Sequence, residues 1–215
     1  MDGNRRWAKQ RGLPTLEGHQ QGYETLKRAA EWCRDMDVHH LVVYAFSTEN
    51  WNRSKEEVGY LMDLMRVLLH ERLDAPHKPD EAIHIVGDHA RFPQDIQDLI
   101  SKLHSRNVPT AAFHFWVCAS YGGKSEILSA VHALLAQQKN TVTEEEFTSA
   151  LWTARMPNPD IIIRTGGEKR LSNFLLWRSG YSELFFLDTY WPDFSKEELE
   201  TVIAEFAGRK RNYGK

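Results

Sequence analysis

The sequence predicts an α/β fold, with a mostly parallel central sheet flanked by helices on both faces. We expect one domain over residues 1–215. Short apolar segments alternate with amphipathic stretches long enough to be helices, a pattern typical of strands joined by helical crossovers. Parallel strands need such crossovers, because a tight turn can join only antiparallel ones. A chain with 41% hydrophobic and 27% charged residues can also bury a substantial core.

In the first half of the chain, the helices follow from spacing and the strands from continuous apolar runs. A helix is predicted over 19–35, where four residues share one face, and a buried strand over 41–46, which reads Leu-Val-Val-Tyr-Ala-Phe. The strongest helix covers 55–73, with apolar residues three and four apart over 58–69. Two prolines within 75–80 end it.

The second half repeats the alternation. In chain order, the predicted elements are a strand over 82–86, a helix over 94–105, a strand over 111–119, helices over 124–138 and 144–153, strands over 160–163 and 183–187, and a closing helix over 196–207. In such sheets, ligands gather at the carboxyl ends of the strands.

The composition excludes several classes of protein. The apolar runs are far shorter than the roughly 20 residues of a membrane span, and no signal peptide is visible. Cys33 and Cys118 are too few for a disulfide scaffold. The net charge of −3 gives no general attraction to nucleic acid, so we expect no nucleic-acid partner. A cytoplasmic protein that binds anions only locally is therefore expected.

Two segments carry the residues for local anion binding. Residues 164–178 follow an apolar run and place Arg164, Lys169, Arg170 and Ser172 around a Gly-Gly turn. Cations, hydroxyls and free backbone amides at the end of a strand form an anion pocket. Residues 1–9, Met-Asp-Gly-Asn-Arg-Arg-Trp-Ala-Lys, again combine arginine, glycine and one carboxylate. Two such sites suggest an enzyme that holds two phosphorylated substrates.

A third segment resembles the end of a phosphate-binding P-loop. Residues 121–125 read Tyr-Gly-Gly-Lys-Ser between a strand and a helix, but Cys118 occupies the position where the full pattern has glycine. A nucleotide-binding protein therefore stands as a lesser alternative. A tight turn between strand and helix explains the segment at least as well.

Six short blocks stand out along the chain and read MDGNRRWA (1–8), GH (18–19), YAFSTENWNR (44–53), RTGGEKRLSNFLLW (164–177), SELFF (182–186) and WPDF (191–194). Taken together and in this order, they resemble the signature blocks of the cis-prenyltransferases, of which undecaprenyl diphosphate synthase is the nearest type. The resemblance implies condensation of isopentenyl diphosphate with an allylic diphosphate, commonly farnesyl diphosphate, and Mg²⁺ as cofactor. It also implies a homodimer, and a fold unlike that of the all-α trans-prenyl synthases. A long polyprenyl product would require contact with a membrane for its release.

The chemistry of the first block agrees with an allylic diphosphate site. Asp2 is the expected Mg²⁺ ligand, because a hard cation prefers carboxylate and phosphate oxygens together. Gly3 would permit close backbone approach, and the amides of Asn4 to Arg6 would open a helix at the diphosphate. The Arg6 guanidinium would make a bidentate contact with the diphosphate. The resemblance adds Arg5, Trp7, His19 and Arg53 to the substrate-binding residues.

The resemblance assigns the remaining roles. It implies that Arg164, Arg170 and Ser172 bind isopentenyl diphosphate. Glu183 resembles the family's carboxylate near the metal, at the subunit interface. Asn50, with Trp51 beside it, resembles the block that places substrate and relays a proton.

An apolar product tunnel is the last expected feature. Ala45 lies where the family has a small tunnel-lining residue, and Leu61 and Met65 would form the facing wall. The same apolar stripe is also ordinary core, and periodicity does not separate the two readings.

The sequence departs from the family pattern at three points. The pattern has an apolar strand immediately before Met1, which this sequence does not contain; Thr15 stands at a common arginine, and Ser120 at a frequent asparagine.

Each block also has a structural explanation: a turn at Asp-Gly-Asn, a solvated helix face after it, and a plain loop at Gly-Gly. A non-catalytic partner subunit of a prenyltransferase complex is the second alternative.

Overall fold

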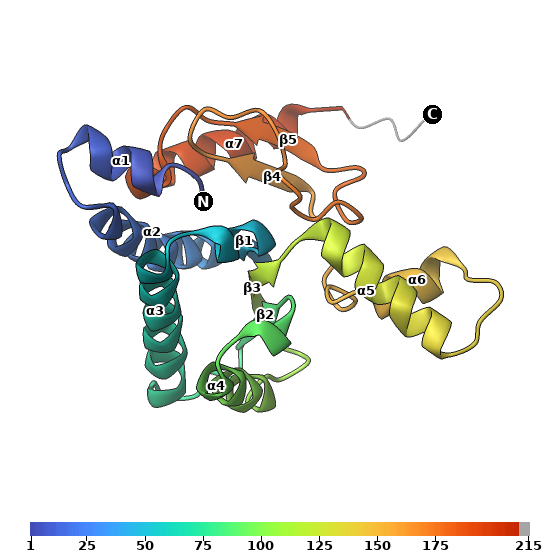
Figure 1. Cartoon of the computed structure of the whole chain (residues 1–215). Coiled ribbons are helices and arrows are strands. Elements are labelled where there is room, and N and C mark those ends of the chain that lie inside the picture. Colours follow the sequence, from blue (N-terminus) through green and yellow to red (C-terminus); the bar gives the residue numbers. More distant parts are fainter. Residues whose placement is uncertain (211–215) are drawn as a thin grey trace. The chain divides into compact units, whose positions relative to one another are not determined.

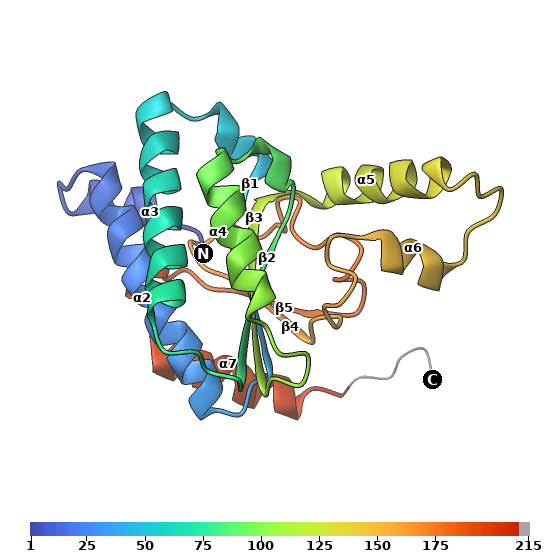
Figure 2. The same cartoon turned by 90° about the horizontal axis from the view of Figure 1, so that it is seen from below.

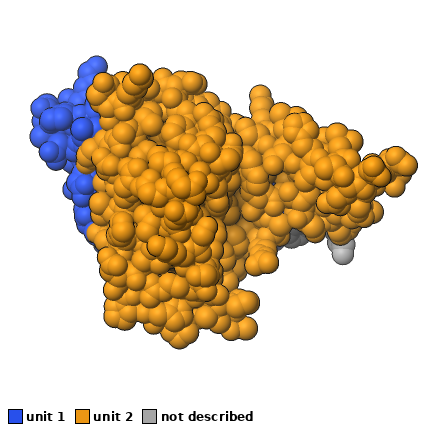
Figure 3. All heavy atoms as spheres, turned by 60° about the horizontal axis from the view of Figure 1, so that its bottom comes forward, with its two compact units in different colours: residues 1–32, 158–170, 178–215 blue, residues 33–157, 171–177 orange. Residues whose placement is uncertain are grey.

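The structure, a computed structural model, describes residues 1–210. It divides into two compact units (Figure 3). Unit 1 comprises Met1–Trp32, Asn158–Arg170 and the described residues from Arg178 onwards. Unit 2 comprises Cys33–Pro157 and Leu171–Trp177. Every strand pair is parallel and the elements alternate as predicted, which confirms the α/β class.

Unit 2 contains a three-stranded parallel sheet in the order β1-β3-β2. The strands are β1 (His40–Ser47), β2 (Glu81–Val86) and β3 (Phe113–Tyr121), and the helices are α3 (Lys55–Asp74), α4 (Gln94–Ser105), α5 (Gly123–Ala136) and α6 (Glu144–Ala150). Short 3₁₀ helices, η1 (Thr48–Asn52) and η2 (His89–Arg91), follow β1 and β2. Helices α3 and α4 pack side by side, as do α5 and α6 (Figures 1 and 2).

One face of this sheet forms an apolar core. It gathers Val86, Trp116, Cys118, Tyr121, Met156 and Leu175. Side chains two apart along a strand share a face, which is why Trp116 and Cys118 of β3 both belong to it. Because the strands are parallel, the segments after Ser47, Val86 and Tyr121 all leave the same edge of the sheet.

Unit 1 contains a two-stranded parallel sheet of β4 (Ile161–Arg164) and β5 (Glu183–Phe186). Its helices are α1 (Asn4–Gln10), most of α2 (Thr15–Asp35), the 3₁₀ helix η3 (Trp191–Asp193) and α7 (Lys196–Gly208). The strands thus belong to two hydrogen-bonded sheets among the described residues. No helix of residues 1–210 is long and apolar enough to cross a membrane.

Most boundaries lie within two residues of the predicted ones, and the exceptions have local causes. Helix α2 begins four residues earlier than predicted, at Thr15, directly after Pro14. Helix α6 was predicted to reach 153 but ends at Ala150. The amide and hydroxyl of Thr153 instead donate to the buried Glu126 carboxylate, at 2.9 and 2.7 Å.

Candidate active site

Asp2 is fixed at the carboxyl end of β4 by its own backbone. Its N–H donates to Thr165 Oγ1 at 3.0 Å, and the Thr165 hydroxyl donates back to the Asp2 carbonyl at 2.9 Å. That carbonyl also accepts the N–H of Trp191 at 2.9 Å. Two hydrogen bonds therefore hold Asp2 against the segment that follows β4, and the third joins it to η3, although both partners lie more than 160 positions away in sequence.

The Asp2 carboxylate lies between two guanidinium groups. Arg164 donates to Oδ2 at 3.0 Å, and Arg6 Nη2 is 3.3 Å from Oδ1. Partial burial alone would raise the pKa of Asp2, but the Arg164 hydrogen bond and the charges of both arginines outweigh it and lower that pKa below its ordinary value. Asp2 is therefore an anion at neutral pH.

A shared acidic residue extends this cluster. Glu168 lies 3.6 Å from Arg6 through Oε1, and its other oxygen accepts from Arg170. Arg164 in turn donates to the Arg170 carbonyl. We call these five side chains (Asp2, Arg6, Arg164, Glu168 and Arg170) the arginine cluster. It unites the two predicted anion-binding segments in a single site of unit 1.

The glycine turn contributes to the cluster in a different way from the one predicted. Free amides were expected at Gly166 and Gly167, but their N–H groups donate to the carbonyls of Thr189 and Leu187, both at 2.8 Å. This prediction was wrong, because the turn lies beside the segment that follows β5 and uses its amides there. Gly166 adopts φ 90°, which favours glycine, and a Cβ there would also come within 2.7 Å of Arg6 Nη2.

The other residues of the first block support helix α1. Gly3 precedes it at φ 111°, and a Cβ there would lie 2.7 Å from the Tyr190 ring. Trp7 donates its indole N–H to Asp193 at 2.7 Å. Asn4 packs on α2: a Cβ at Gly22 would come within 2.5 Å of Asn4 Oδ1. This oxygen is buried and has no hydrogen-bond partner among the described residues.

Three further predicted residues of unit 1 have distinct surroundings. Arg5 is exposed on α1, whereas His19 is buried in α2. Glu183 is held by Arg209 at 2.6 Å. The register pairs Glu183 with Ile161 and Phe186 with Arg164, so Glu183 lies at the opposite end of the two-stranded sheet from Asp2. One chain does not bring the two expected metal carboxylates together.

Unit 2 positions Asn50 and Trp51 at the carboxyl edge of its sheet. Asn50 Oδ1 accepts the N–H of Ser47 at 3.2 Å, which orients its amide. The indole of Trp51 donates to Ser120 Oγ at 3.1 Å and packs edge-on against Phe46, with ring centroids 4.9 Å apart.

Two other predicted substrate-binding residues also lie in unit 2. Arg53 pairs with Glu57 at 2.9 Å. Ser172 adopts the left-handed conformation, with φ 49°.

The expected tunnel residues lie on β1 and α3, also in unit 2. Ala45 is half-buried and falls where the β1–β3 register slips between Tyr44 and Phe46, so it is the extra residue of a bulge. Such bulges re-aim side chains beside active sites. Met65 is buried and Leu61 half-buried on α3.

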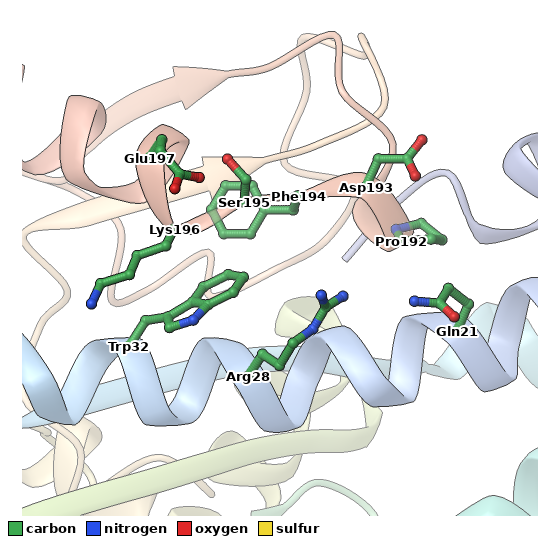
Figure 4. Close-up of a pocket in the computed structure, with 9 residues that line it drawn as sticks. All are labelled: Gln21, Arg28, Trp32, Pro192, Asp193, Phe194, Ser195, Lys196 and Glu197. Atoms are coloured by element: carbon green, nitrogen blue, oxygen red, sulfur yellow. The ribbon is translucent and has the colours of Figure 1, made fainter.

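A separate cleft of about 610 Å³ lies in unit 1, between α2 and the segment from η3 to the start of α7 (Figure 4). Trp32 and Phe194 supply its aromatic surface, and Arg28 points into it. None of the predicted substrate, metal or tunnel residues lines this cleft.

The comparisons identify the family. Residues 1–214 match the family described as "Putative undecaprenyl diphosphate synthase". The chain belongs to this family. It is 40% identical to the isoprenyl transferase of Aquifex aeolicus, covering 100% of this chain and 93% of that protein. It is 42% identical to the isoprenyl transferase of Treponema denticola, over 100% of this chain and 94% of the relative.

Solved structures support the same assignment. Lavandulyl diphosphate synthase from Lavandula x intermedia, in complex with dimethylallyl diphosphate, superposes with a TM-score of 0.90 at 32% identity, covering 100% of this chain and 95% of that one. A probable undecaprenyl diphosphate synthase from Campylobacter jejuni superposes with a TM-score of 0.81 at 32% identity, over 91% and 93% of the two chains.

Family membership leaves the P-loop alternative without support, and the geometry agrees. The amides of Gly123 and Lys124, which would cradle a phosphate in a P-loop, donate to the backbone and side-chain oxygens of Asn173 at 2.7 and 2.8 Å. Nor does any comparison favour a non-catalytic subunit.

Sequence reasoning missed Thr165, which holds Asp2 in place. It named Ser120 only as a departure from the family pattern, whereas the structure shows that Ser120 holds Trp51 from a left-handed backbone with φ 51°. The family's usual asparagine at 120 was the signal, because asparagine tolerates that conformation better than serine does.

Proposed function

We propose that the chain is a cis-prenyltransferase that condenses isopentenyl diphosphate units onto an allylic diphosphate, with farnesyl diphosphate as the expected primer and a polyprenyl diphosphate as product. The observation that carries the proposal is the arginine cluster. In it one carboxylate, Asp2, contacts both Arg6 of the allylic segment and Arg164 of the isopentenyl segment. Two diphosphates held by these neighbouring arginines would have their reacting carbons close together.

The reaction breaks the bond between the allylic carbon and its diphosphate oxygen, forms a new carbon–carbon bond, and releases a proton from the isopentenyl unit. Negative charge grows on the departing diphosphate, and a fixed guanidinium such as Arg6 would stabilise it. Arg164 and Arg170 would hold the isopentenyl diphosphate through charge-assisted hydrogen bonds. Asn50, oriented by its hydrogen bond with Ser47, would place the isopentenyl group and relay its proton.

The residues present fit the proposed Mg²⁺. Asp2 is ionised and partly exposed, and Mg²⁺ in phosphate-transfer sites is commonly held by one or two carboxylates together with phosphate oxygens. The ion would neutralise charge on the allylic diphosphate. Because Glu183 lies at the other end of its sheet, its proposed role near the metal requires a second copy of the chain.

The homodimer is part of the proposal and has a candidate surface. Helix α5 exposes three apolar residues, Leu128, Val131 and Leu135, which are 58%, 36% and 63% accessible to solvent. Their spacing places them on one helical face. Contiguous apolar surface of this kind is typical of protein–protein contacts. We also propose transient contact of the cytoplasmic enzyme with the membrane, where a long apolar product would be released.

A single assay tests the function: radiolabelled isopentenyl diphosphate incubated with farnesyl diphosphate and Mg²⁺. Wild type should form labelled polyprenyl products, and Asp2→Ala should reduce turnover by orders of magnitude without loss of fold. Excess Mg²⁺ should not restore the rate. Asp63→Ala is the matched control, because Asp63 also pairs with an arginine, at 2.9 Å, but on the exposed face of α3. An Asp2→Ala variant that keeps a third of wild-type turnover would refute the role.

A further inference from the structure

The loop of residues 171–177 in unit 2 has an unusual backbone. Ser172, Asn173 and Leu175 all adopt positive φ, at 49°, 67° and 46°. Non-glycine residues rarely do so, and each costs on the order of 1 kcal/mol or more unless its surroundings impose it. Asparagine tolerates this conformation best. The contacts that impose it should therefore centre on Asn173.

Asn173 joins this loop to two other elements. Its carbonyl accepts the N–H of Gly123 at 2.7 Å, and its Oδ1 accepts the N–H of Lys124 at 2.8 Å, so it caps the amino end of α5. Its Nδ2 donates to Glu49 Oε1 in η1 at 3.0 Å. One short side chain thus fixes the loop to both a helix end and the segment that follows β1.

The fit around Asn173 is tight. A Cβ at Gly122 would lie 2.7 Å from Asn173 Nδ2 and 2.6 Å from Thr48 Oγ1. A Cβ at Gly123 would lie 2.7 Å from Leu176 Cγ. The two glycines are therefore required for the loop to sit against α5, which explains the Gly-Gly turn without a phosphate.

Glu49 is a suitable anchor for the Asn173 amide. Partial burial alone would raise the pKa of Glu49, but hydrogen bonds from its own backbone and from Ser47, Asn173 and Thr48 outweigh this and lower that pKa. A carboxylate acceptor strengthens a hydrogen bond relative to a neutral one. Glu49 also directly precedes Asn50, whose side chain caps Ser47 in the same turn.

We propose that Asn173 is a positioning residue for isopentenyl diphosphate. By tying the loop to α5 and to Glu49, it holds the neighbouring Ser172 in its left-handed conformation and fixes it relative to the turn that carries Asn50. Asn173 itself need not touch substrate. The inference rests on the proposed function, which assigns Ser172 to the isopentenyl diphosphate site.

The test first breaks the Asn173–Glu49 hydrogen bond and then restores it with donor and acceptor exchanged. Asn173→Asp keeps the acceptor for Lys124 and tolerates positive φ, but it opposes two carboxylates. We expect it to raise the KM and the Kd for isopentenyl diphosphate roughly 10-fold or more, the scale of one charge-assisted hydrogen bond. The KM for farnesyl diphosphate should stay within about 3-fold. The double variant Asn173→Asp with Glu49→Gln restores a donor and an acceptor, and should recover most of the loss.

Asn107→Asp is the matched control. The Asn107 amide also makes two hydrogen bonds with the Ile83 backbone, accepting from its N–H at 2.9 Å and donating to its carbonyl at 2.7 Å, but it joins the segment after α4 to β2. It should lower the melting temperature without selective loss of isopentenyl diphosphate binding.

The outcomes separate the inference from the proposed function. If Asn173→Asp lowers the melting temperature as Asn107→Asp does and leaves the Kd for isopentenyl diphosphate unchanged, the inference is wrong while the function stands. If Asn173→Asp does not fold, Glu49→Ala, which removes the acceptor of the Asn173 amide, decides in its place, and an unchanged Kd for isopentenyl diphosphate overturns the inference. If wild type binds isopentenyl diphosphate without condensing it, the proposed function fails, and the Kd comparison still decides the role of Asn173.

Discussion

The buried carboxyl group of Glu126 should be one of the strongest single contributors to the stability of unit 2. Its side chain is fully buried on α5 and accepts three hydrogen bonds. They come from the Tyr121 hydroxyl at 2.5 Å and from the amide and hydroxyl of Thr153 at 2.9 and 2.7 Å. Burial and the nearby Glu126 raise the pKa of Tyr121, so its hydroxyl remains a donor at all ordinary pH values.

Glu126→Ala removes the acceptor and leaves these donors buried. An unsatisfied buried polar group costs about 1–3 kcal/mol. About 2 kcal/mol for the Thr153 amide and about 1 kcal/mol for each of the two rotatable hydroxyls, of Tyr121 and Thr153, give an expected loss of about 4 kcal/mol in the free energy of unfolding. Glu126→Gln keeps one oxygen for Thr153, and the Tyr121 hydroxyl can turn to accept from the new amide, so we expect a loss of about 1 kcal/mol.

Urea unfolding followed by circular dichroism measures these losses. With a urea m-value of about 2 kcal/mol/M, the midpoint should fall by about 2 M for alanine and about 0.5 M for glutamine. Hydrogen exchange over residues 151–157 should accelerate in the alanine variant, because the Thr153 amide loses its acceptor. Glu200→Gln, at an exposed site on α7, is the control and should leave the midpoint unchanged. Equal midpoints for the alanine and glutamine variants would refute the hydrogen-bond argument.

Four further predictions follow from the site and the fold. Arg164→Ala should raise the KM for isopentenyl diphosphate roughly 10- to 150-fold, and Arg53→Ala should raise the KM for the allylic substrate by a similar factor, because each removes one charge-assisted hydrogen bond. Equal effects of each variant on both substrates would refute the assignment. Ala45→Leu should shorten the polyprenyl product, measured by mass spectrometry, because close packing leaves little room for added carbons; an unchanged product from a folded variant would place the tunnel elsewhere. Burial and neighbouring histidines lower the pKa of His84 from 6.5 to about 4, so the unfolded chain takes up a proton there that the folded chain does not. The free energy of unfolding should therefore fall as pH drops from 6.5 towards 4. The shift corresponds to at most about 3 kcal/mol, and solvent screening of the half-buried ring reduces the expected loss to about 1–2 kcal/mol. Equal urea midpoints at pH 7 and pH 4.5 would contradict this. Leu135→Lys should convert the proposed dimer into a monomer in light scattering, and an unchanged mass would exclude this face of α5.

Local sequence patterns were sufficient for the elements. The helix over 94–105 was predicted with the observed bounds, because its buried residues Ile96, Leu99, Ile100 and Leu103 recur at three- and four-residue spacing. Strands were predicted within two residues from continuous apolar runs. The parallel pairing followed from the length of the crossovers.

Local sequence patterns did not predict the contacts between distant segments of the chain. Nothing in residues 1–9 indicates that Asp2 binds Thr165, or that Arg6 reaches the glycine turn. The turn itself was read as a source of free amides, because a sequence does not show which carbonyls will lie opposite its N–H groups. The family resemblance supplied the list of site residues, and the structure supplied the partners that hold them.

The arginine cluster has a consequence for the energetics of binding. It carries three positive and two negative side chains, so its cations already have internal counter-ions. Any anion that binds Arg6 or Arg164 competes with the Asp2 carboxylate, and any cation that binds Asp2 removes that competitor. A divalent cation and a diphosphate should therefore bind with positive heterotropic cooperativity, and each must raise the affinity for the other by the same factor.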